Sequence, residues 1–423
     1  MKNFQIMQTG GDTASSRGSL QVNVVSIQNN FPIQNAKVSI SYKGDPQNIL
    51  EQVSTNSSGQ TEQVSLAAPP IELSLEPQDQ QPYSEYNLTV SAPGFKSRVI
   101  SGTEILADTT AIQPVRLEPE TDQTPIQDPI VIPDHTLYGY YPPKIAESEI
   151  KPVRESGEIV LSRVVVPQTV VVHDGVPSDP TAANYFVPYR DYIKNVASSE
   201  IYATWPASTI TANVLAIMSF TLNRVYTEWY RNQGYDFTIT SSTAYDHKWI
   251  YGRNIYNSIS NIVDEIFDNY LSRPGVKQPI LTQYCDGKRV QCPDWMTQWG
   301  SCDLGERGYS AIEILRYFYG DNMYINTAEQ IAGIPASFPG YNLTIGSSGD
   351  KVRQIQEQLD TIATVYTAIP RVSVDGIYGP GTAAAVREFQ SIFGLPQTGV
   401  IDFPTWYRIS HIYVAVTRIA ELN

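Results

Sequence analysis

Glu200 is the residue whose type and position most favour catalysis. In the segment from Tyr189 to Ile201, helical spacing places Ile193, Val196 and Glu200 on one face, the face that should turn inward. A carboxyl group buried there is desolvated, which raises its pKa and prepares it to donate a proton near neutral pH. Spacing alone leaves a second interpretation open, in which Glu200 is an ordinary helix-end residue that points to solvent.

Three cysteines form a second group of potentially reactive residues. Cys285, Cys292 and Cys302 are crowded into one segment, and an odd set of this kind argues against a disulfide framework. We therefore interpret them as reduced structural thiols. A zinc site made by these thiols with His247 has tolerable chemistry, but the spacings match no compact site, so no metal or cofactor is expected.

The composition indicates a globular chain of several domains. A length of 423 residues suggests roughly two to four domains, and 41% hydrophobic residues supply enough apolar material for cores. The net charge of −14 argues against a nucleic-acid partner, because phosphate binding needs clustered Lys and Arg. No apolar run reaches the length of a membrane span, and residues 1–17 lack the features of a secretory signal.

The elements that would position these residues fall into distinct stretches. After a tail of residues 1–19, residues 20–117 alternate apolar and polar side chains between turn clusters, which predicts an all-β sandwich. Residues 118–163 are rich in Pro, Asp, Glu, Gln and Thr, and we interpret them as an extended linker that a protease could reach.

The second half of the chain is predicted to be mainly helical. Residues 164–326 form a helix-rich α+β domain, with one long helix starting just after Pro206 and another over about 255–270. Residues 340–423 carry two amphipathic helices on either side of a turn-rich loop around Tyr378. The fold class predicted from the sequence is therefore multidomain.

Two of the outer stretches resemble known domain families. Residues 20–117 resemble the carboxypeptidase regulatory-like domain, whose strand, Thr-Asn-x-x-Gly turn and late Gly-Phe recur here in order, and that resemblance brings no chemistry. The run from Asp375 to Thr382, with Phe389-Gln390 and the stretch 394–399, resembles the peptidoglycan-binding domain family. That resemblance implies an all-α three-helix module that binds peptidoglycan, with a shallow sugar site at Tyr378.

The central stretch resembles the stage II sporulation protein D family. Residues 192–206, Tyr-Ile-Lys-Asn-Val-Ala-Ser-Ser-Glu-Ile-Tyr-Ala-Thr-Trp-Pro, match one block of that family, and residues 295–320, with Met-Thr-Gln-Trp-Gly and Glu-Ile-Leu-Arg-Tyr-Phe-Tyr, match a second. The family consists of peptidoglycan lytic transglycosylases, so the resemblance implies that Glu200 is the catalytic acid. It also implies that Gln298 and Trp299 contact the substrate.

The sequence departs from this family at two positions of the long helix. Where the family carries a Lys and an Arg thought to serve the site, Thr211 and Met218 stand here. The nearby polar residues that could bind sugar instead are Asn213, Asn223 and Arg224.

A lone carboxyl group suits lytic transglycosylation. Glu200 would protonate the glycosidic oxygen and then, as carboxylate, take a proton from the 6-hydroxyl of the sugar, which closes a 1,6-anhydro ring. Hydrolysis would need a second carboxylate at a defined separation. Asp191, Asp236 and Asp246 are available for that role, but nothing in their spacing nominates one.

The order of the four stretches resembles the clostridial spore cortex-lytic enzymes. That resemblance implies a precursor stored in the spore, activated by a subtilisin-like protease during germination, which then degrades the peptidoglycan of the spore cortex. Two alternatives stay open. One is an N-acetylmuramoyl-L-alanine amidase, although four histidines, one of them His135 in the linker, are a thin supply of metal ligands. The other is a spore-wall binding protein without catalytic activity.

Overall fold

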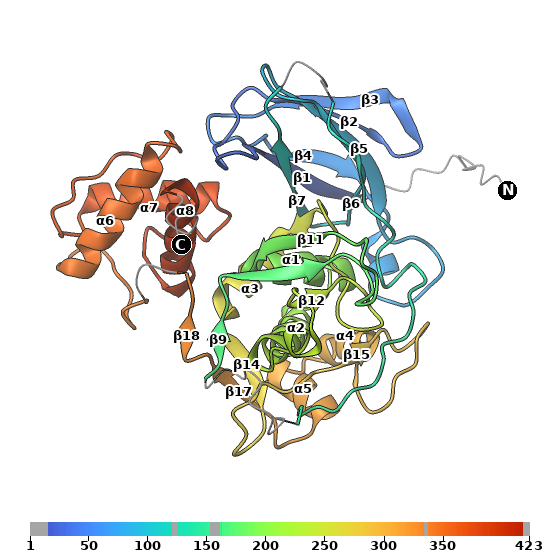
Figure 1. Cartoon of the computed structure of the whole chain (residues 1–423). Coiled ribbons are helices and arrows are strands. Elements are labelled where there is room, and N and C mark those ends of the chain that lie inside the picture. Colours follow the sequence, from blue (N-terminus) through green and yellow to red (C-terminus); the bar gives the residue numbers. More distant parts are fainter. Residues whose placement is uncertain (1–15, 121–125, 153–160, 162, 334–336, 418–423) are drawn as a thin grey trace.

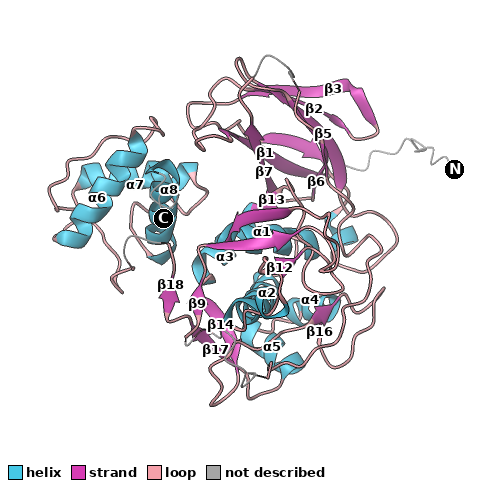
Figure 2. Ribbon diagram, in the orientation of Figure 1, coloured by secondary structure: helices cyan, strands magenta, loops and turns pink. Residues whose placement is uncertain are grey.

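The computed structural model of the chain describes residues 16–120, 126–152, 161, 163–333 and 337–417. Figure 1 shows three parts: strands β1–β7 at the top, a mixed helical part beneath them, and helices α6–α8 at one side. Figure 2 shows that strands dominate only the first of these parts. Like the fold class predicted from the sequence, the molecule is multidomain, and its C-terminal part is helical.

The N-terminal part consists of two facing sheets. One has the order β13-β7-β1-β4, and the other has the order β3-β2-β5-β6-β8. Leu20, Val22 and Val24 are buried while their neighbours are more exposed, as the alternation predicts for a strand with one face in the core. The strands are β1 (Arg17–Ser26), β2 (Lys37–Tyr42), β3 (Asp45–Ser54), β4 (Val64–Ala67), β5 (Ser84–Ser91), β6 (Arg98–Ile105), β7 (Thr110–Leu117), β8 (Ile130–Val131) and β13 (Ile255–Tyr256), with a short 3₁₀ helix η1 (Ile71–Ser74).

The sandwich shares a sheet and a buried ion pair with the central part. β13 belongs to the central part by sequence, yet it pairs antiparallel with β7. Two hydrogen bonds of 3.0 and 2.6 Å join the guanidinium group of Arg253 to both carboxylate oxygens of Glu104, and both side chains are almost fully buried. The two parts are therefore packed against each other, and not only joined by a linker.

Residues 126–152, which we call the strap, are packed where the composition predicts an extended linker. β8 pairs in parallel with β6, and Ile132, His135 and Leu137 are buried. Figure 1 shows the strap, in teal, leaving the sandwich and running along one side of the central part. The linker prediction was wrong for this stretch, because a few well-spaced apolar residues anchor a chain whose average composition is polar. The predicted cleavage region spans about residues 145–166, and residues 153–160 and 162 of it are outside the described residues.

The central part is built around a buried helix. α2 (Ala207–Tyr226) starts directly after Pro206, as predicted, and nearly all of its residues are buried. The second predicted helix is shorter than 255–270, because the chain is extended in β13 before it and in β14 after it. The remaining elements are α1 (Tyr189–Glu200), α3 (Asn257–Ile266), α4 (Gln298–Glu306), α5 (Ala311–Tyr319), η2 (Arg231–Gln233), β9 (Val165–Val166), β10 (Thr169–His173), β11 (Asn184–Pro188), β12 (Ile239–Thr240), β14 (Asn269–Ser272), β15 (Tyr284–Cys285), β16 (Met296–Thr297), β17 (Tyr324–Thr327) and β18 (Gln330–Ile331).

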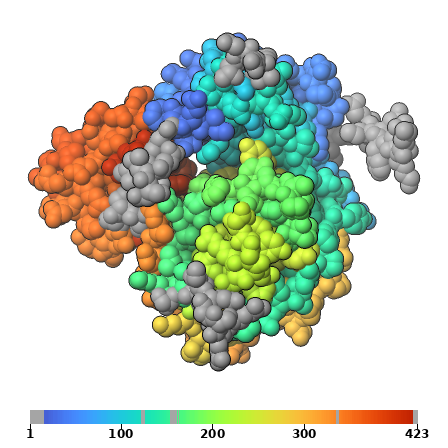
Figure 3. Space-filling view, in the orientation of Figure 1, coloured from blue at the N-terminus to red at the C-terminus, as the bar shows by residue number. Residues whose placement is uncertain are grey.

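The C-terminal part is a three-helix module. α6 (Asp350–Ala363), α7 (Pro380–Ile392) and α8 (Phe403–Thr417) bury Leu359 and Phe389 between them. The module contacts the central part through α8, where Arg408 forms an ion pair with Asp264 of α3. Figure 3 shows the module in orange and red, lying against both other parts of the molecule.

Candidate active site

Glu200 is the last residue of α1 and lies in the interior. Its side chain is 3% exposed, so the structure agrees with the inward-facing interpretation. One carboxylate oxygen, Oε1, accepts a hydrogen bond of 2.6 Å from the backbone N–H of Lys248. The other, Oε2, accepts a short hydrogen bond from the hydroxyl of Tyr284. The carboxyl group is thus held by donors from two segments that lie 48 and 84 residues further along the chain.

Burial sets the acidity of Glu200. Desolvation is the largest effect and raises the pKa of its carboxyl group, while the charge of Lys144 and the hydrogen bonds from Lys248 and Tyr284 lower it by less. The net result is a raised pKa. A carboxyl group in this setting stays protonated to higher pH than an exposed glutamate, which is the property that a general acid needs.

The imidazole ring of His247 packs against Tyr284. The ring of His247 stacks on that of Tyr284, with 5.9 Å between centroids and 12° between planes. Nδ1 of His247 is 3.0 Å from the hydroxyl oxygen of Tyr192, and burial holds the pKa of His247 well below its usual value. The imidazole is therefore neutral and acts as packing for the tyrosine.

A cavity of about 100 Å³ opens at Glu200. Gln298 lines it and donates a hydrogen bond of 2.9 Å from Nε2 to the backbone oxygen of Glu200. Nearly half of the lining comes from the strap, namely Thr136, Gly139, Tyr140, Tyr141, Pro142 and Lys144. The backbone oxygen of Ser199, the residue before Glu200, also binds the strap, because it accepts hydrogen bonds from both the N–H and the Oγ1 of Thr136.

Lys144 brings a positive charge from the strap into this cavity. Its ammonium group lies 5.0 Å from the ring centres of both Tyr284 and Phe220 and donates to the backbone oxygen of Asp246. Burial lowers the pKa of Lys144, and the negative charge of Glu200 opposes that shift. The lysine and the glutamate therefore favour each other's charged forms, although the sequence contains no local signal that connects them.

The prediction of reduced thiols was wrong for two of the three cysteines. Cys285 and Cys292 form a disulfide that closes a short loop, whereas Cys302 is buried and free. The count of cysteines misled because an odd number still allows one pair. Asp286 stabilises the loop by accepting backbone N–H groups on both oxygens, including a 2.8 Å hydrogen bond from Val290. The disulfide also removes two thiolates from the zinc ligand set considered for His247.

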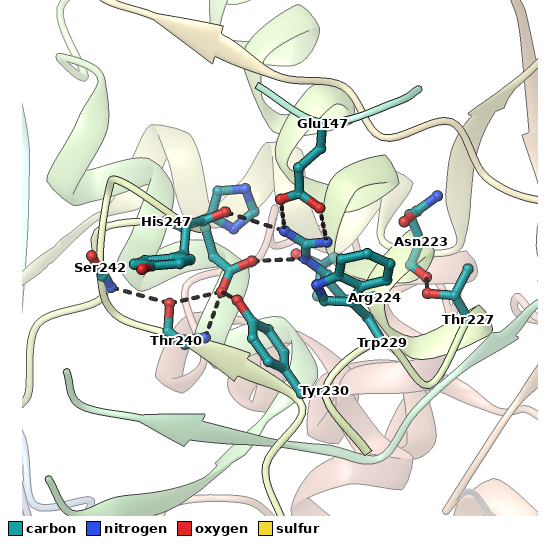
Figure 4. Close-up of polar contacts among 12 residues, drawn as sticks. Glu147, Asn223, Arg224, Thr227, Trp229, Tyr230, Thr240, Ser242 and His247 are labelled. Carbon is teal, nitrogen blue, oxygen red and sulfur yellow. Dashed lines mark hydrogen bonds and ion pairs between the residues drawn. The ribbon is translucent and has the colours of Figure 1, made fainter. Parts of the chain in front are cut away.

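None of the three aspartates considered as a second carboxylate lines the cavity of Glu200. Asp246 is fully occupied by Arg224, Tyr230 and Thr240, as Figure 4 shows for the residues around it. Asp286 does line the cavity and was missed by the sequence reasoning, but its oxygens are engaged in the disulfide loop. Within the part of the chain that the structure describes, two carboxyl groups line the cavity, those of Glu200 and Asp286, and the pKa of Glu200 is raised.

The predicted substrate-binding residues separate into different places. Asn213 is buried and binds Thr209 and Ser301, so it joins α2 to α4. Trp299 is buried against Trp205, with 5.1 Å between ring centroids. Neither lines the cavity, because the inner face of α2 and the apolar face of α4 are both used for packing.

Two other predicted substrate-binding residues lie in the central part near the strap, and one lies in the C-terminal module. Arg224 binds Asp246 and the strap residue Glu147, as Figure 4 shows. Asn223 next to it binds the segment 278–279. Tyr378 is 1% exposed and donates its hydroxyl to the backbone oxygen of Gly399, so it is a core residue and offers no sugar-stacking surface.

The described residues hold no group of three or more His, Cys, Asp or Glu side chains that could bind a metal ion. None of the helices in the described ranges has the length and apolar character needed to cross a bilayer.

Comparison with known proteins relates the C-terminal module to a family of peptidoglycan-binding domains. Residues 348–409 match the family model described as a putative peptidoglycan binding domain. The chain is 39% identical over 67 residues to the zinc D-Ala-D-Ala carboxypeptidase of Streptomyces albus G, covering 16% of this chain and 25% of that protein. It is 34% identical over 71 residues to an uncharacterized protein in the bpoA1 3' region of Kitasatospora aureofaciens, covering 16% and 55%. The chain thus spans between a quarter and about half of these curated relatives.

Among solved structures, the SleB N-terminal domain is 31% identical, and the match covers 18% of this chain and 99% of that one with a TM-score of 0.16. The Bacillus anthracis TIE protein is 14% identical, with coverages of 25% and 17% and a TM-score of 0.17. The sequence matches support peptidoglycan as a partner of this multidomain protein and a function related to the bacterial cell wall.

Proposed function

We propose that the chain is a precursor of an enzyme that cleaves the glycan strands of peptidoglycan by lytic transglycosylation. The observation that carries the proposal is Glu200, a buried carboxyl group with a raised pKa that faces a cavity. The module at residues 348–409 supports the substrate class, because it would hold the enzyme on its polymer. The resemblance of the central part to lytic transglycosylases supports the reaction type.

Glu200 acts first as an acid and then as a base in the proposed reaction. As an acid it protonates the glycosidic oxygen, so that the bond from the anomeric carbon to that oxygen breaks. The resulting carboxylate then removes the proton from the 6-hydroxyl group as its oxygen attacks the anomeric carbon. The backbone N–H of Lys248 and the hydroxyl of Tyr284 both donate to the carboxylate, so they stabilise it between the two steps.

The strap supports the proposal that the uncut chain is inactive. A cavity of about 100 Å³ is smaller than the ~300–1,000 Å³ of sites that enclose a small ligand, and strap residues form much of its wall. A glycan strand would therefore need the strap to leave. We propose that a protease of the subtilisin class cuts between about residues 145 and 166 in the spore, and that the cortex is the substrate.

The test compares the cut chain with its Glu200→Gln variant on cortex peptidoglycan, with products identified by mass spectrometry. Wild type should release anhydro-muramyl ends, and the variant should be slower by a factor of about 10²–10⁴ or more, since one group serves both steps. Reducing ends would indicate hydrolysis, and free stem peptides would indicate an amidase. An undiminished variant would exclude Glu200, and an absence of any soluble product would favour a binding protein.

A further inference from the structure

The second half of the strap is held by two buried carboxamides of the central part. Gln283 donates from Nε2 to the backbone oxygen of Ile145 at 2.6 Å and accepts the N–H of Glu147 at 2.8 Å. Gln278 makes the same two kinds of bond to the N–H and the oxygen of Lys151, at 2.7 and 3.1 Å. A carboxamide that both donates and accepts binds the peptide groups themselves, whatever side chains they carry.

Two arginines bind the acidic side chains of the same stretch. Arg224 holds both oxygens of Glu147, at 2.5 and 3.0 Å, and Arg273 holds both oxygens of Glu149 at 2.7 Å. Between them, the N–H of Leu281 donates to the backbone oxygen of Glu149 at 2.8 Å. Two extended residues span at most about 7 Å, so the arginines form a pair of adjacent carboxylate sites.

The segment that carries the two carboxamides is held in place by α2 and not by the strap alone. Asn223 donates to Gln278 and to the backbone oxygen of Pro279, at 3.2 and 2.7 Å. Ser219 donates to the backbone oxygen of Ile280, and Thr282 donates to that of Ala216 at 2.6 Å. We call the segment 278–284, together with Arg224 and Arg273, the track. Because α2 holds this segment, the track is preorganised for a ligand.

The track leads directly to the catalytic carboxyl group. Gln283 is followed by Tyr284, whose hydroxyl binds Glu200. On the strap, Ile145 lies on the track while its neighbour Lys144 lies in the cavity of Glu200. The strap thus occupies one continuous path, with its lysine at the reaction site and its two glutamates on the arginines.

We infer that the track is a peptide subsite of the enzyme and that its ligand, once the strap has left, is the acidic stem peptide of peptidoglycan. The inference rests on the proposed function, which supplies the polymer. Stem peptides carry amide groups and free carboxylates and branch from the glycan strand beside the bond to be cleaved. The two carboxamides would bind the peptide groups of the stem peptide, and the two arginines would bind its carboxylates. In the uncut chain the strap occupies the place of the stem peptide.

The experiment measures kcat/KM of the cut chain on two glycan substrates, one with intact stem peptides and one from which an amidase has removed them. Wild type should favour the peptide-bearing strands by about tenfold or more, as a charged hydrogen-bonded pair predicts. Arg273→Gln should bring that ratio towards one. The matched control is Arg307→Gln, at an exposed arginine directly after α4 that pairs with Asp303 and lies over the ring of Tyr309, and it should keep the wild-type ratio. A ratio of one for wild type would overturn the inference.

A binding measurement separates failure of this inference from failure of the proposed function. Calorimetry on the cut Glu200→Gln chain with a free stem tetrapeptide needs no cleavage. Binding that Arg273→Gln weakens and Arg307→Gln does not would support the track even if no variant cleaves glycan. Absence of binding, or equal binding by both arginine variants, would show that the track serves the strap alone.

Discussion

Glu200 illustrates how a single side chain acquires a special acidity from residues distant in the chain. Its helix supplies the buried position, but the donors come from Lys248 and Tyr284, and the nearest cation comes from Lys144. Burial raises the pKa of the carboxyl group, and the three neighbours limit the rise. An acid balanced in this way can lose its proton during the reaction and regain it afterwards.

The raised pKa of Glu200 predicts a pH-dependent cost in stability. Because the folded chain binds this proton more tightly than the unfolded chain, ionisation destabilises the fold as pH rises through the unfolded and then the folded pKa. Each unit of pKa shift corresponds to about 1.4 kcal/mol. Glu200→Gln removes the charge and should therefore raise the Tm at pH 8, by about 2–4 °C for each kcal/mol gained, but not at pH 4.

Thermal unfolding of the uncut chain at both pH values checks this expectation. The control is Glu306→Gln, at an exposed glutamate that ends α4. An equal change in Tm at pH 4 and pH 8 for Glu200→Gln would contradict the prediction, because the gain would then not come from an ionisation.

At this scale the sequence predicted two residues that line the cavity, Glu200 and Gln298, and missed most of the others. The spacing of Ile193, Val196 and Glu200 was sufficient to predict an inward carboxyl group. Tyr284, Lys144 and Lys248 meet it only through tertiary folding, and no local pattern marks them. The polar residues of α2 were predicted as sugar ligands, yet Asn213 joins two helices, because a buried amide is satisfied by the nearest backbone and hydroxyl groups.

At the scale of elements, the strap and the track explain why composition was a poor guide. Helices α1 and α2 have clear periodicity and were predicted well, whereas the strap has a polar average and was predicted as an open linker. Its order comes from partners outside itself, mainly Gln278, Gln283 and the two arginines. These hydrogen bonds are long-range, so the sequence of the strap itself contains no signal for them.

Loss of both strap glutamates should release part of the inhibition without any cut. The double variant Glu147→Gln, Glu149→Gln removes the charged hydrogen bonds from Arg224 and Arg273 to the strap, together with the pair of Glu147 and Lys151 inside the strap. A hydrogen bond to a charged group is worth about 1.5–3 kcal/mol, and less where the pair is partly exposed, as for Glu149. The uncut double variant should therefore release soluble muropeptides from cortex at a measurable rate when the wild-type chain releases none. Ser148→Ala, between the two glutamates and exposed, is the matched control. Inactivity of the uncut double variant, with full activity after cutting, would contradict the role given to these pairs.

At the scale of the whole molecule, the module packs against the central part, but none of its described residues lines the cavity of Glu200. The module has its own core, and its contact with the central part is centred on Asp264, which accepts Arg190, Lys194 and Arg408. These three cations hold the pKa of Asp264 well below its usual value despite its burial. The interface was not predictable from the sequence, because its charges come from α1, α3 and α8.

The module should bind peptidoglycan by itself. A fragment of residues 340–423 is expected to co-sediment with purified cortex sacculi, since its three helices bury apolar residues of their own such as Leu359 and Phe389. The complementary fragment without these residues should bind less. If the module stays in the supernatant while the rest of the chain sediments, the binding role belongs to the catalytic part.

The pairing of β13 with β7 bears on whether the proposed activation is reversible. In the uncut chain the sandwich, the strap and the central part are one molecule, so each interface forms at an effective concentration in the millimolar range. After a cut between the strap and β9, the same interfaces join two molecules, and rebinding depends on how dilute the released part becomes. The free sandwich would also carry an uncovered strand edge at β7, where β13 had been paired. Before the cut, the sandwich and the strap can separate from the central part only transiently. After a single peptide bond is cut they can dissociate, and dilution would prevent them from binding again.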